Sequence, residues 1–263
     1  MTVREREQAF AVPIRHVVER LRIGVLDARA LQVRVEVDDV DELRAAAVRR
    51  GGDGTCQFLL AERRFDAIEL RGPGTELTVG LLPTHTWWAA DFSTADGLRH
   101  FPNLPTEEVF TTPDPERTSG HVTSTKPLVL RDGTIIRGLR VTFENGVAVE
   151  IEADENGEAL RSQLTMDDGA LRLGELALVD RQGRIGPLDT VFYDTLLDEN
   201  AASHIAFGTG FPFLVDGDDV ARVNTSGTHV DFMIGSPEVE VDGVTAAGER
   251  VPVLRGGDWQ AFA

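Results

Sequence analysis

Short stretches in which apolar and polar residues alternate make up most of the chain from about residue 61 onward. A period of two residues is typical of half-buried strands. The pattern is clearest at 128–157, where Asp-Gly at 132–133 and Asn-Gly at 145–146 are flanked by alternating apolar residues. These dipeptides favour tight hairpin turns, so the stretch predicts an antiparallel meander. Further strands are predicted at 65–70, 75–82, 174–180, 190–194, 229–234 and within 237–260.

The first 60 residues have a different pattern. Residues 12–26 and 37–50 have the spacing of amphipathic helices, and a strand-like alternation at 31–37 lies between them. We therefore predict a lead segment of helix and strand at 1–60, followed by one main domain at 61–263. Many short strands with a few helices indicate an α+β fold that is strand-rich, with an antiparallel or mixed sheet.

Two later stretches also predict helices. Residues 158–174 have a helical period with a break in the middle, a second N-cap at 167–168 and Gly174 as the stop. The alanine-rich stretch 200–208 predicts a short helix capped by Asn200.

Composition narrows the class of protein. Of the 263 residues 41% are apolar, which is enough for a sizeable core, and the formal net charge is −18. Such an acidic chain argues against nucleic-acid or anionic-membrane partners, which need a basic face. The single cysteine, Cys56, excludes an intrachain disulfide and a thiolate metal cluster. No long apolar run and no signal-peptide pattern is present, so we expect a cytoplasmic protein.

The strongest chemical signal lies between residues 199 and 231. His229 and Asp231 are two residues apart in an apolar, strand-like stretch, so both side chains point to one face. An imidazole and a carboxylate that converge in this way favour a divalent cation. Glu199 and His204, roughly 25 residues earlier, form a second such pair, although an acidic residue before a helix is most often a cap.

Two further carboxylates have both a functional and an ordinary explanation. Glu107 and Glu108 lie in the proline-rich stretch 101–117, which predicts a stiff, irregular loop, and either residue is a ligand candidate or an exposed acid. Glu175 precedes an almost unbroken apolar run. It is either buried with a partner charge or metal, or placed at the solvent end of its strand.

Together the candidates are four carboxylates and two imidazoles: Glu108, Glu175, Glu199, His204, His229 and Asp231. Two metal ions about 3.5–4 Å apart need about this many ligands, and they make hydroxide available near neutral pH. The set therefore indicates metal-assisted hydrolysis of an amide or a phosphate ester. The sequence has no G-x-S-x-G and no H-E-x-x-H, so serine hydrolases and zincins lack support.

Five segments, in order, resemble the carboxyl-terminal half of the thermophilic metalloaminopeptidase family (aminopeptidase T and aminopeptidase S). They lie at 64–81, 103–117, 172–179, 192–208 and 229–236, and the resemblance covers about residues 61–263. It implies metal ligands at Glu108, Glu175, Glu199, His204, His229 and Asp231, and does not extend to Glu107. One of the glutamates, with Glu175 as the candidate, bridges the ions or acts as general base.

The resemblance also implies two divalent ions (Zn, Co or Mg), peptide substrates that lose their N-terminal residues, and a homodimer in the cytoplasm. One departure concerns catalysis. The family carries a tyrosine seven residues after the histidine matched by His204, where this chain has Phe211. A phenyl ring cannot donate a hydrogen bond to a developing oxyanion, and such a loss costs roughly 10²–10³ in rate. Tyr193 is a candidate to replace it in space.

A second departure is that the family has a larger amino-terminal domain that helps to enclose its site, and residues 1–60 do not resemble it. Three hypotheses follow. The chain is a working metalloaminopeptidase, or a metal- and peptide-binding relative that is catalytically weak, or a truncated product without a function of its own.

Overall fold

The computed structural model describes residues 23–25, 33–35, 60–89, 92–100 and 106–260. Residues 1–46 and 47–263 form two compact units. In the first unit, β1 (Ile23–Val25) pairs with β2 (Val33–Val35) in an antiparallel ladder. The strand predicted at 31–37 is therefore present, whereas the end of the helix predicted at 12–26 is wrong, because Ile23–Val25 pairs with a partner strand. The rest of that helix and the helix at 37–50 lie outside the described residues.

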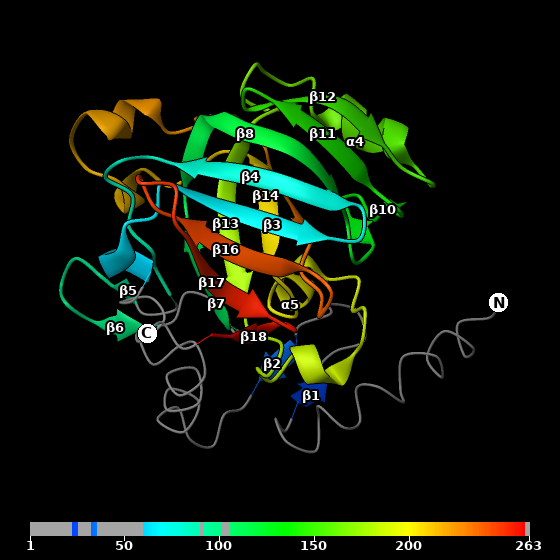
Figure 1. The fold of residues 1–263 in the computed structure, drawn as a ribbon. Helices are drawn as coiled ribbons and strands as arrows, with labels where there is room; N and C mark the ends of the chain where they lie inside the picture. Colours follow the sequence, from blue (N-terminus) through cyan, green and yellow to red (C-terminus); the bar gives the residue numbers. More distant parts are fainter. Residues whose placement is uncertain (1–22, 26–32, 36–59, 90–91, 101–105, 261–263) are drawn as a thin grey trace, which may run out of the picture. The chain divides into compact units, whose positions relative to one another are not determined.

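The second unit contains an eight-stranded sheet (Figure 1). Its strands follow one another in the order β12-β11-β8-β4-β3-β16-β17-β18, and every pair is antiparallel. Their bounds are β3 (Ala67–Gly72), β4 (Thr75–Leu81), β8 (Pro113–Thr123), β11 (Arg140–Glu144), β12 (Val147–Glu152), β16 (Glu240–Val244), β17 (Arg250–Arg255) and β18 (Asp258–Trp259).

A smaller sheet of four antiparallel strands has the order β15-β14-β13-β7. It consists of β7 (Glu108–Thr111), β13 (Leu173–Val179), β14 (His204–Gly208) and β15 (His229–Met233). Two hairpins complete the described strands: β5 (Phe92–Ser93) pairs with β6 (Arg99–His100), and β9 (Leu128–Val129) pairs with β10 (Ile135–Ile136).

The main hydrophobic core lies between the two sheets. In Figure 1, β13 and β14 run behind β3 and β4. One continuous cluster of buried side chains joins Leu70 and Val79 of the large sheet to Leu176, Ile205 and Phe232 of the small sheet. One face of the small sheet is therefore part of the core, and its other face is turned away from the large sheet.

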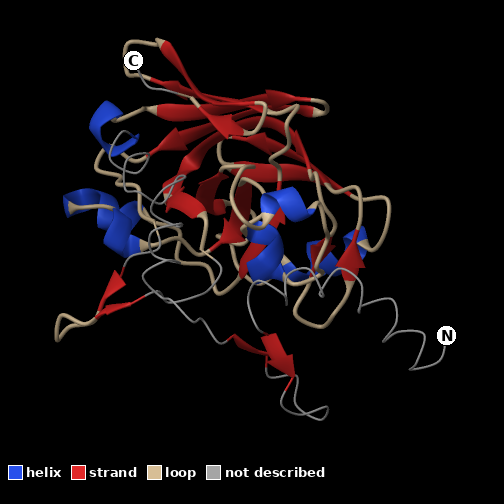
Figure 2. Ribbon diagram, turned by 90° about the horizontal axis from the view of Figure 1, so that it is seen from below, coloured by secondary structure: helices blue, strands red, loops and turns tan. Residues whose placement is uncertain are grey.

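The helices are short, and most lie on the side away from the large sheet (Figure 2). They are a helical segment at 60–63, α4 (Gly157–Gln163), α5 (Thr195–Glu199) and the 3-10 turns η1 (Gly186–Leu188), η2 (Pro212–Leu214) and η3 (Gly217–Arg222). Asp194 caps α5, because its carboxylate accepts a hydrogen bond from the Leu197 N–H at 3.2 Å. Within the part of the chain that the structure describes, no helix is long and apolar enough to cross a bilayer.

The α+β prediction is confirmed, and so are the two hairpins, but β9 and β10 form a sheet of their own, so the predicted meander at 128–157 is not continuous. Asn145 and Gly146 connect β11 to β12 with φ angles of 49° and 82°, the left-handed conformations that an Asn-Gly turn supplies. The predicted helix at 158–174 is correct only as far as Gln163. Gly174 lies inside β13, where a side chain would overlap the carbonyl oxygens of Gly208 and Thr209. The glycine permits a close approach of two backbones and does not end a helix.

Three other predictions are wrong. Residues 190–194 form no strand, and 200–208 is not a helix, because α5 ends at Glu199 and His204–Gly208 is β14. The alternation of Ile205 and Phe207 into the core explains the strand. Glu108, which we expected in an irregular loop, begins β7.

Candidate metal centre

The outer face of the small sheet gathers five of the six predicted ligands. Residues opposite each other in an antiparallel ladder share a face, and so do residues two apart on a strand. Glu108 lies opposite Val179 on β13, four residues from Glu175. His204 lies opposite Ala177, and Asp231 is linked to Glu175 through Ala206. His229, two residues before Asp231, points to the same face.

Two alanines lie in the middle of this face. Ala206 stands between Glu175 and Asp231 across the sheet, and Ala177 stands beside His204. Both are fully buried. Because a methyl group barely rises above the backbone, the longer ligand side chains around these two positions can converge over them. The alternate residues Leu176, Ile205 and Phe207 point the other way into the core.

Glu199 reaches the same place from the end of α5. The following residue, Asn200, is fully buried and ends the helix. Its side-chain N–H donates to the Leu196 carbonyl at 2.9 Å, and its side-chain oxygen accepts from the backbone N–H of Glu107 at 2.5 Å. Asn200 therefore links the end of α5 to the start of β7, next to Glu108. The prediction that it caps a following helix is wrong.

All six predicted residues thus come together. Ligand atoms lie within 4.8 Å of one another in three overlapping groups: Glu108, Glu175 and His204; Glu175, His229 and Asp231; Glu199, His204 and Asp231. Glu175 belongs to the first two groups. One of its oxygens lies 3.9 Å from His204 Nε2 and the other lies 3.1 Å from His229 Nε2.

A backbone carbonyl oxygen orients each of the two imidazole rings through its Nδ1 atom. His204 Nδ1 lies 3.2 Å from the Ala202 carbonyl oxygen, and His229 Nδ1 lies 3.0 Å from that of Thr209. A carbonyl only accepts, so each Nδ1 carries a hydrogen that it donates. The Nε2 atoms then face the carboxylates, at 3.1 Å from Glu108 and 3.1 Å from Asp231. Metal-binding histidines are held in this way.

Burial and charge shift the pKa values of the cluster strongly. Burial raises the pKa of Glu175 to about 7 and that of Glu199 to about 8, and neighbouring carboxylates add to both shifts. Burial disfavours charge on the imidazoles, but adjacent carboxylates outweigh it and raise the pKa of His204 to about 10 and that of His229 to about 11. The positive charges of the two protonated imidazoles therefore offset the negative charges of the carboxylates. A bound divalent cation would supply the same positive charge.

The residues present fit a divalent metal. Glu108 Oε2 is buried and, although it is close to His204, has no hydrogen-bond partner of normal geometry in the described part of the chain. A buried carboxylate oxygen in that position is costly unless a cation contacts it. The donor set is nitrogen and oxygen without sulfur, which suits hard to borderline ions such as Mg, Co or Zn.

A pocket of about 280 Å³ opens over the cluster. Its acidic side is formed by Glu108, Glu175, Glu199, His229 and Asp231, with Thr106 beside them, and its apolar wall by Phe92, Phe110, Phe211 and Phe213. The ring of Phe211 lies 5.8 Å from that of His229 and 5.3 Å from that of Phe110. The site thus joins a floor of ionisable side chains to an aromatic wall.

Sequence reasoning missed most of this wall. It singled out Phe211 for its family position, but not Phe213, which is half exposed, or Phe92. The signal that was available is the apolar run 211–215 in a turn region. Tyr193 does not line the pocket. It is 40% exposed, and its hydroxyl accepts a hydrogen bond from Arg137 at 3.2 Å.

Glu107, adjacent to a predicted ligand, has a structural role. Its carboxylate accepts hydrogen bonds from the backbone N–H groups of Arg184, at 2.7 and 2.8 Å, and Ile185, at 3.2 Å. Burial raises the pKa of Glu107, while these N–H donors act against that rise. Glu107 therefore anchors the 183–185 turn and points away from the cluster.

Comparison with known proteins identifies a single family. The pattern of the thermophilic metalloprotease (M29) family matches residues 53–259. Aminopeptidase T of Thermus aquaticus is 48% identical over 206 residues, which cover 76% of this chain and 50% of that protein. Aminopeptidase PepS of Streptococcus thermophilus is 42% identical over 209 residues, with the same coverage. The chain spans about half the length of the curated relatives that it matches.

Solved structures agree at the level of the fold. Wild-type AmpT from Thermus thermophilus superposes with a TM-score of 0.78 and 43% identity, over 84% of this chain and 56% of that one. A 2,5-dihydroxypyridine dioxygenase from Pseudomonas putida superposes with a TM-score of 0.56 at 16% identity, over 87% of this chain and 64% of that one. At that identity the second likeness concerns the fold alone.

Proposed function

Because the chain belongs to the thermophilic metalloprotease (M29) family, we propose that it is a metal-dependent aminopeptidase that removes N-terminal residues from peptides. The observation that carries this proposal is the meeting of four carboxylates and two imidazoles beneath one pocket. The names of the relatives support the reaction, since those compared above are aminopeptidases.

We propose that the site holds two divalent ions. One set of ligands is Glu108, Glu175 and His204, and the other is Glu175, His229 and Asp231, so Glu175 is shared. Glu199 supplements the sets through its proximity to His204 and Asp231. Zinc, cobalt and magnesium are the candidate ions. When bound, such ions supply a hydroxide at neutral pH and polarise a carbonyl oxygen.

The chain's own groups bind and orient the peptide. The acidity of the whole chain, with a net charge of −18, attracts the positively charged N-terminal end of a peptide. The aromatic wall receives the first side chain. Glu199, which lies near His204 and Asp231 and is not shared between the two ligand sets, is the carboxylate suited to move a proton from attacking water to the departing amine.

A second candidate function is peptide binding with weak catalysis. It is favoured by Phe211, whose ring lies beside His229 in the pocket without a hydroxyl group. The homodimer and the cytoplasmic location both stay predictions.

The deciding experiment measures metal content and turnover on one sample. The purified protein is stripped with a chelator, reconstituted with Co²⁺ or Zn²⁺, and assayed with a leucine anilide. Two ions per chain with turnover that is lost in His229→Ala supports the aminopeptidase. Two ions without turnover supports the weak binding relative. No bound metal would contradict all six ligand assignments together.

A further inference from the structure

Part of the aromatic wall of the pocket belongs to a segment with little regular secondary structure. Residues 211–216 contain the three-residue turn η2, and they bring Phe211 and Phe213 to the pocket. Phe213 packs against Trp88, with ring centroids 5.4 Å apart. Leu214, beneath them, is fully buried. So short a turn does not fix its own position, so tertiary contacts must hold the wall in place.

One set of contacts joins this segment to residues 84–86. The Thr86 N–H donates to the Leu214 carbonyl at 2.8 Å, and the Asp216 N–H donates to Thr84 Oγ1 at 3.0 Å. Asp219, in the following turn η3, accepts a hydrogen bond from the Thr84 N–H at 2.9 Å. These bonds fix the segment on one side only.

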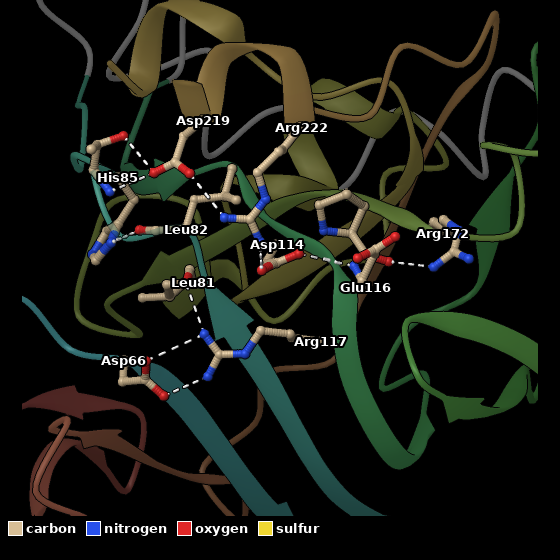
Figure 3. Close-up of polar contacts among 12 residues, drawn as sticks. Asp66, Leu81, Leu82, His85, Asp114, Glu116, Arg117, Arg172, Asp219 and Arg222 are labelled. Carbon is tan, nitrogen blue, oxygen red and sulfur yellow. Dashed lines mark hydrogen bonds and ion pairs between the residues drawn. The ribbon is translucent and has the colours of Figure 1, made fainter. Parts of the chain in front are cut away.

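Arg222, the last residue of η3, supplies the other side. Its Nη1 donates to Asp219 Oδ1 at 2.9 Å and its Nη2 donates to Asp114 Oδ2 at 2.5 Å. Asp114 belongs to β8, is 1% exposed, and lies two residues after Thr112. Thr112 in turn accepts a hydrogen bond from the Phe211 N–H at 3.3 Å. Figure 3 shows Arg222 between the carboxylates of Asp219 and Asp114.

We propose that Arg222 is a positioning residue for the pocket. By joining the buried Asp114 of β8 to Asp219 of η3, it fixes residues 211–216 and so sets how tightly the wall formed by Phe211 and Phe213 holds the N-terminal side chain of a peptide. This role rests on the proposed aminopeptidase function. The proposal also explains the role of Asp114 in the motif Pro-Asp-Pro-Glu-Arg at 113–117, a motif that contributes no ligand to the metal site.

The chain offers a matched control in the same motif. Arg117 has a side chain that is 40% exposed, against 43% for Arg222, and it also bridges a carboxylate and another acceptor. It contacts Asp66 and the Leu81 carbonyl, and no described contact joins it to 211–222. Figure 3 shows it pointing away from Arg222 toward Asp66. Arg222→Met and Arg117→Met therefore remove the same group from two different junctions.

Hydrogen exchange followed by mass spectrometry tests the positioning without any need for catalysis. In Arg222→Met, we expect the amides of 211–216 to exchange at least about tenfold faster than in the wild type, since local opening sets exchange. In Arg117→Met they should keep the wild-type rate. Unchanged exchange in Arg222→Met, or equal acceleration in both variants, overturns the proposal.

Steady-state kinetics then tests the consequence for substrates. With leucine and phenylalanine anilides, Arg222→Met should raise KM about tenfold while kcat and metal content stay near wild type, because ground-state binding is lost. Arg222→Lys, which keeps one charged contact to Asp114, should recover part of the affinity. An unchanged KM in Arg222→Met contradicts the proposal.

The experiments distinguish a failure of the proposed aminopeptidase function from a failure of the positioning role of Arg222. If the wild-type protein hydrolyses no anilide, the aminopeptidase function fails, and the exchange experiment still decides whether Arg222 holds the segment. If Arg222→Met does not fold, Asp114→Asn replaces it, since asparagine keeps the shape of the side chain and removes the charge that Arg222 contacts. Unchanged exchange at 211–216 in Asp114→Asn likewise overturns the proposal.

Discussion

Phe211 lines the pocket beside His229, at the position where the metalloaminopeptidases that this chain resembles carry a tyrosine. Its ring packs against Phe110, Phe213 and His229 at the wall of the pocket. A tyrosine there could donate a hydrogen bond to an oxyanion, which phenylalanine cannot do.

We therefore expect Phe211→Tyr to raise kcat for leucine anilide by roughly 10²–10³-fold, the usual contribution of one such donor. The measurement is steady-state turnover of the metal-reconstituted protein, with metal content determined in parallel. Phe213→Tyr, on the same turn but half exposed, is the control and should leave kcat near wild type. An unchanged kcat in Phe211→Tyr would show that this position does not supply the oxyanion donor.

Some of the candidate ligands were predictable from sequence because they leave a local signal. His229 and Asp231 share a face by strand period, and Glu175 precedes an almost unbroken apolar run. Glu108 and Glu199 needed the family resemblance, since an acid beside a turn or helix is usually a cap or a solvated charge. The aromatic wall was not predictable, because Phe92 and Phe213 are brought together by contacts between distant segments.

At the scale of elements, the small residues of β14 and β13 matter as much as the ligands. Ala206 lies between Glu175 and Asp231 across the sheet, on the face beneath the pocket. Its neighbour Ile205 points into the core. Substitutions at Ala206 should therefore affect metal binding, whereas substitutions at Ile205 should affect the stability of the fold.

Ala206→Leu should abolish most metal binding, because the larger side chain fills the space over which the ligands converge. Overpacking also costs about 1–3 kcal/mol. Ile205→Val is the control, and should lower the free energy of unfolding by about 0.5–1.5 kcal/mol without changing metal content. Metal content by atomic emission and denaturant unfolding check both. Full metal occupancy in Ala206→Leu would mean that the ligands do not meet over this residue.

Gly174 gives a second prediction at this scale. An alanine side chain would overlap the carbonyl oxygens of Gly208 and Thr209, so Gly174→Ala should destabilise the protein by about 1–3 kcal/mol. Gly227→Ala is the matched control, since its nearest neighbour is the flexible Met166 side chain at 3.1 Å. Chemical denaturation compares the two. Equal and small effects would mean that the backbones of β13 and residues 208–209 do not approach each other so closely at Gly174.

The strands and hairpins were predictable where the turn chemistry was explicit, as at Asn145-Gly146. The helical prediction at 200–208 failed, and the prediction at 158–174 holds only as far as Gln163, since its last two residues belong to β13. Leucine- and alanine-rich stretches favour a helix locally, but β13 and β14 gain ladder partners on both sides and bury Leu176, Ile205 and Phe207. Tertiary pairing that outweighs local propensity is invisible to a window of a few residues.

At the scale of the whole molecule, a net charge of −18 makes the acidic site a source of repulsion. Bound cations should therefore stabilise the fold as well as enable chemistry. Metal at about 100 times Kd adds about 2.7 kcal/mol per site if the unfolded chain does not bind it.

We expect the melting temperature of the stripped protein to rise on addition of Co²⁺ or Zn²⁺, as measured by differential scanning calorimetry. His229→Ala should show a smaller rise, because one ligand is gone. An equal rise in the two proteins would point to cation binding at the general acidic surface instead of at the cluster.

The two faces of the small sheet have a consequence for how this protein can change. Candidate ligands and core residues alternate along the same strands, so each position belongs either to the face of the site or to the face of the core. Shifting the pairing of β14 by one residue would turn His204 toward the core and Ile205 toward the pocket. Substitutions can retune the site one position at a time, whereas insertions and deletions should be tolerated in connecting loops and lethal to function within β13, β14 and β15.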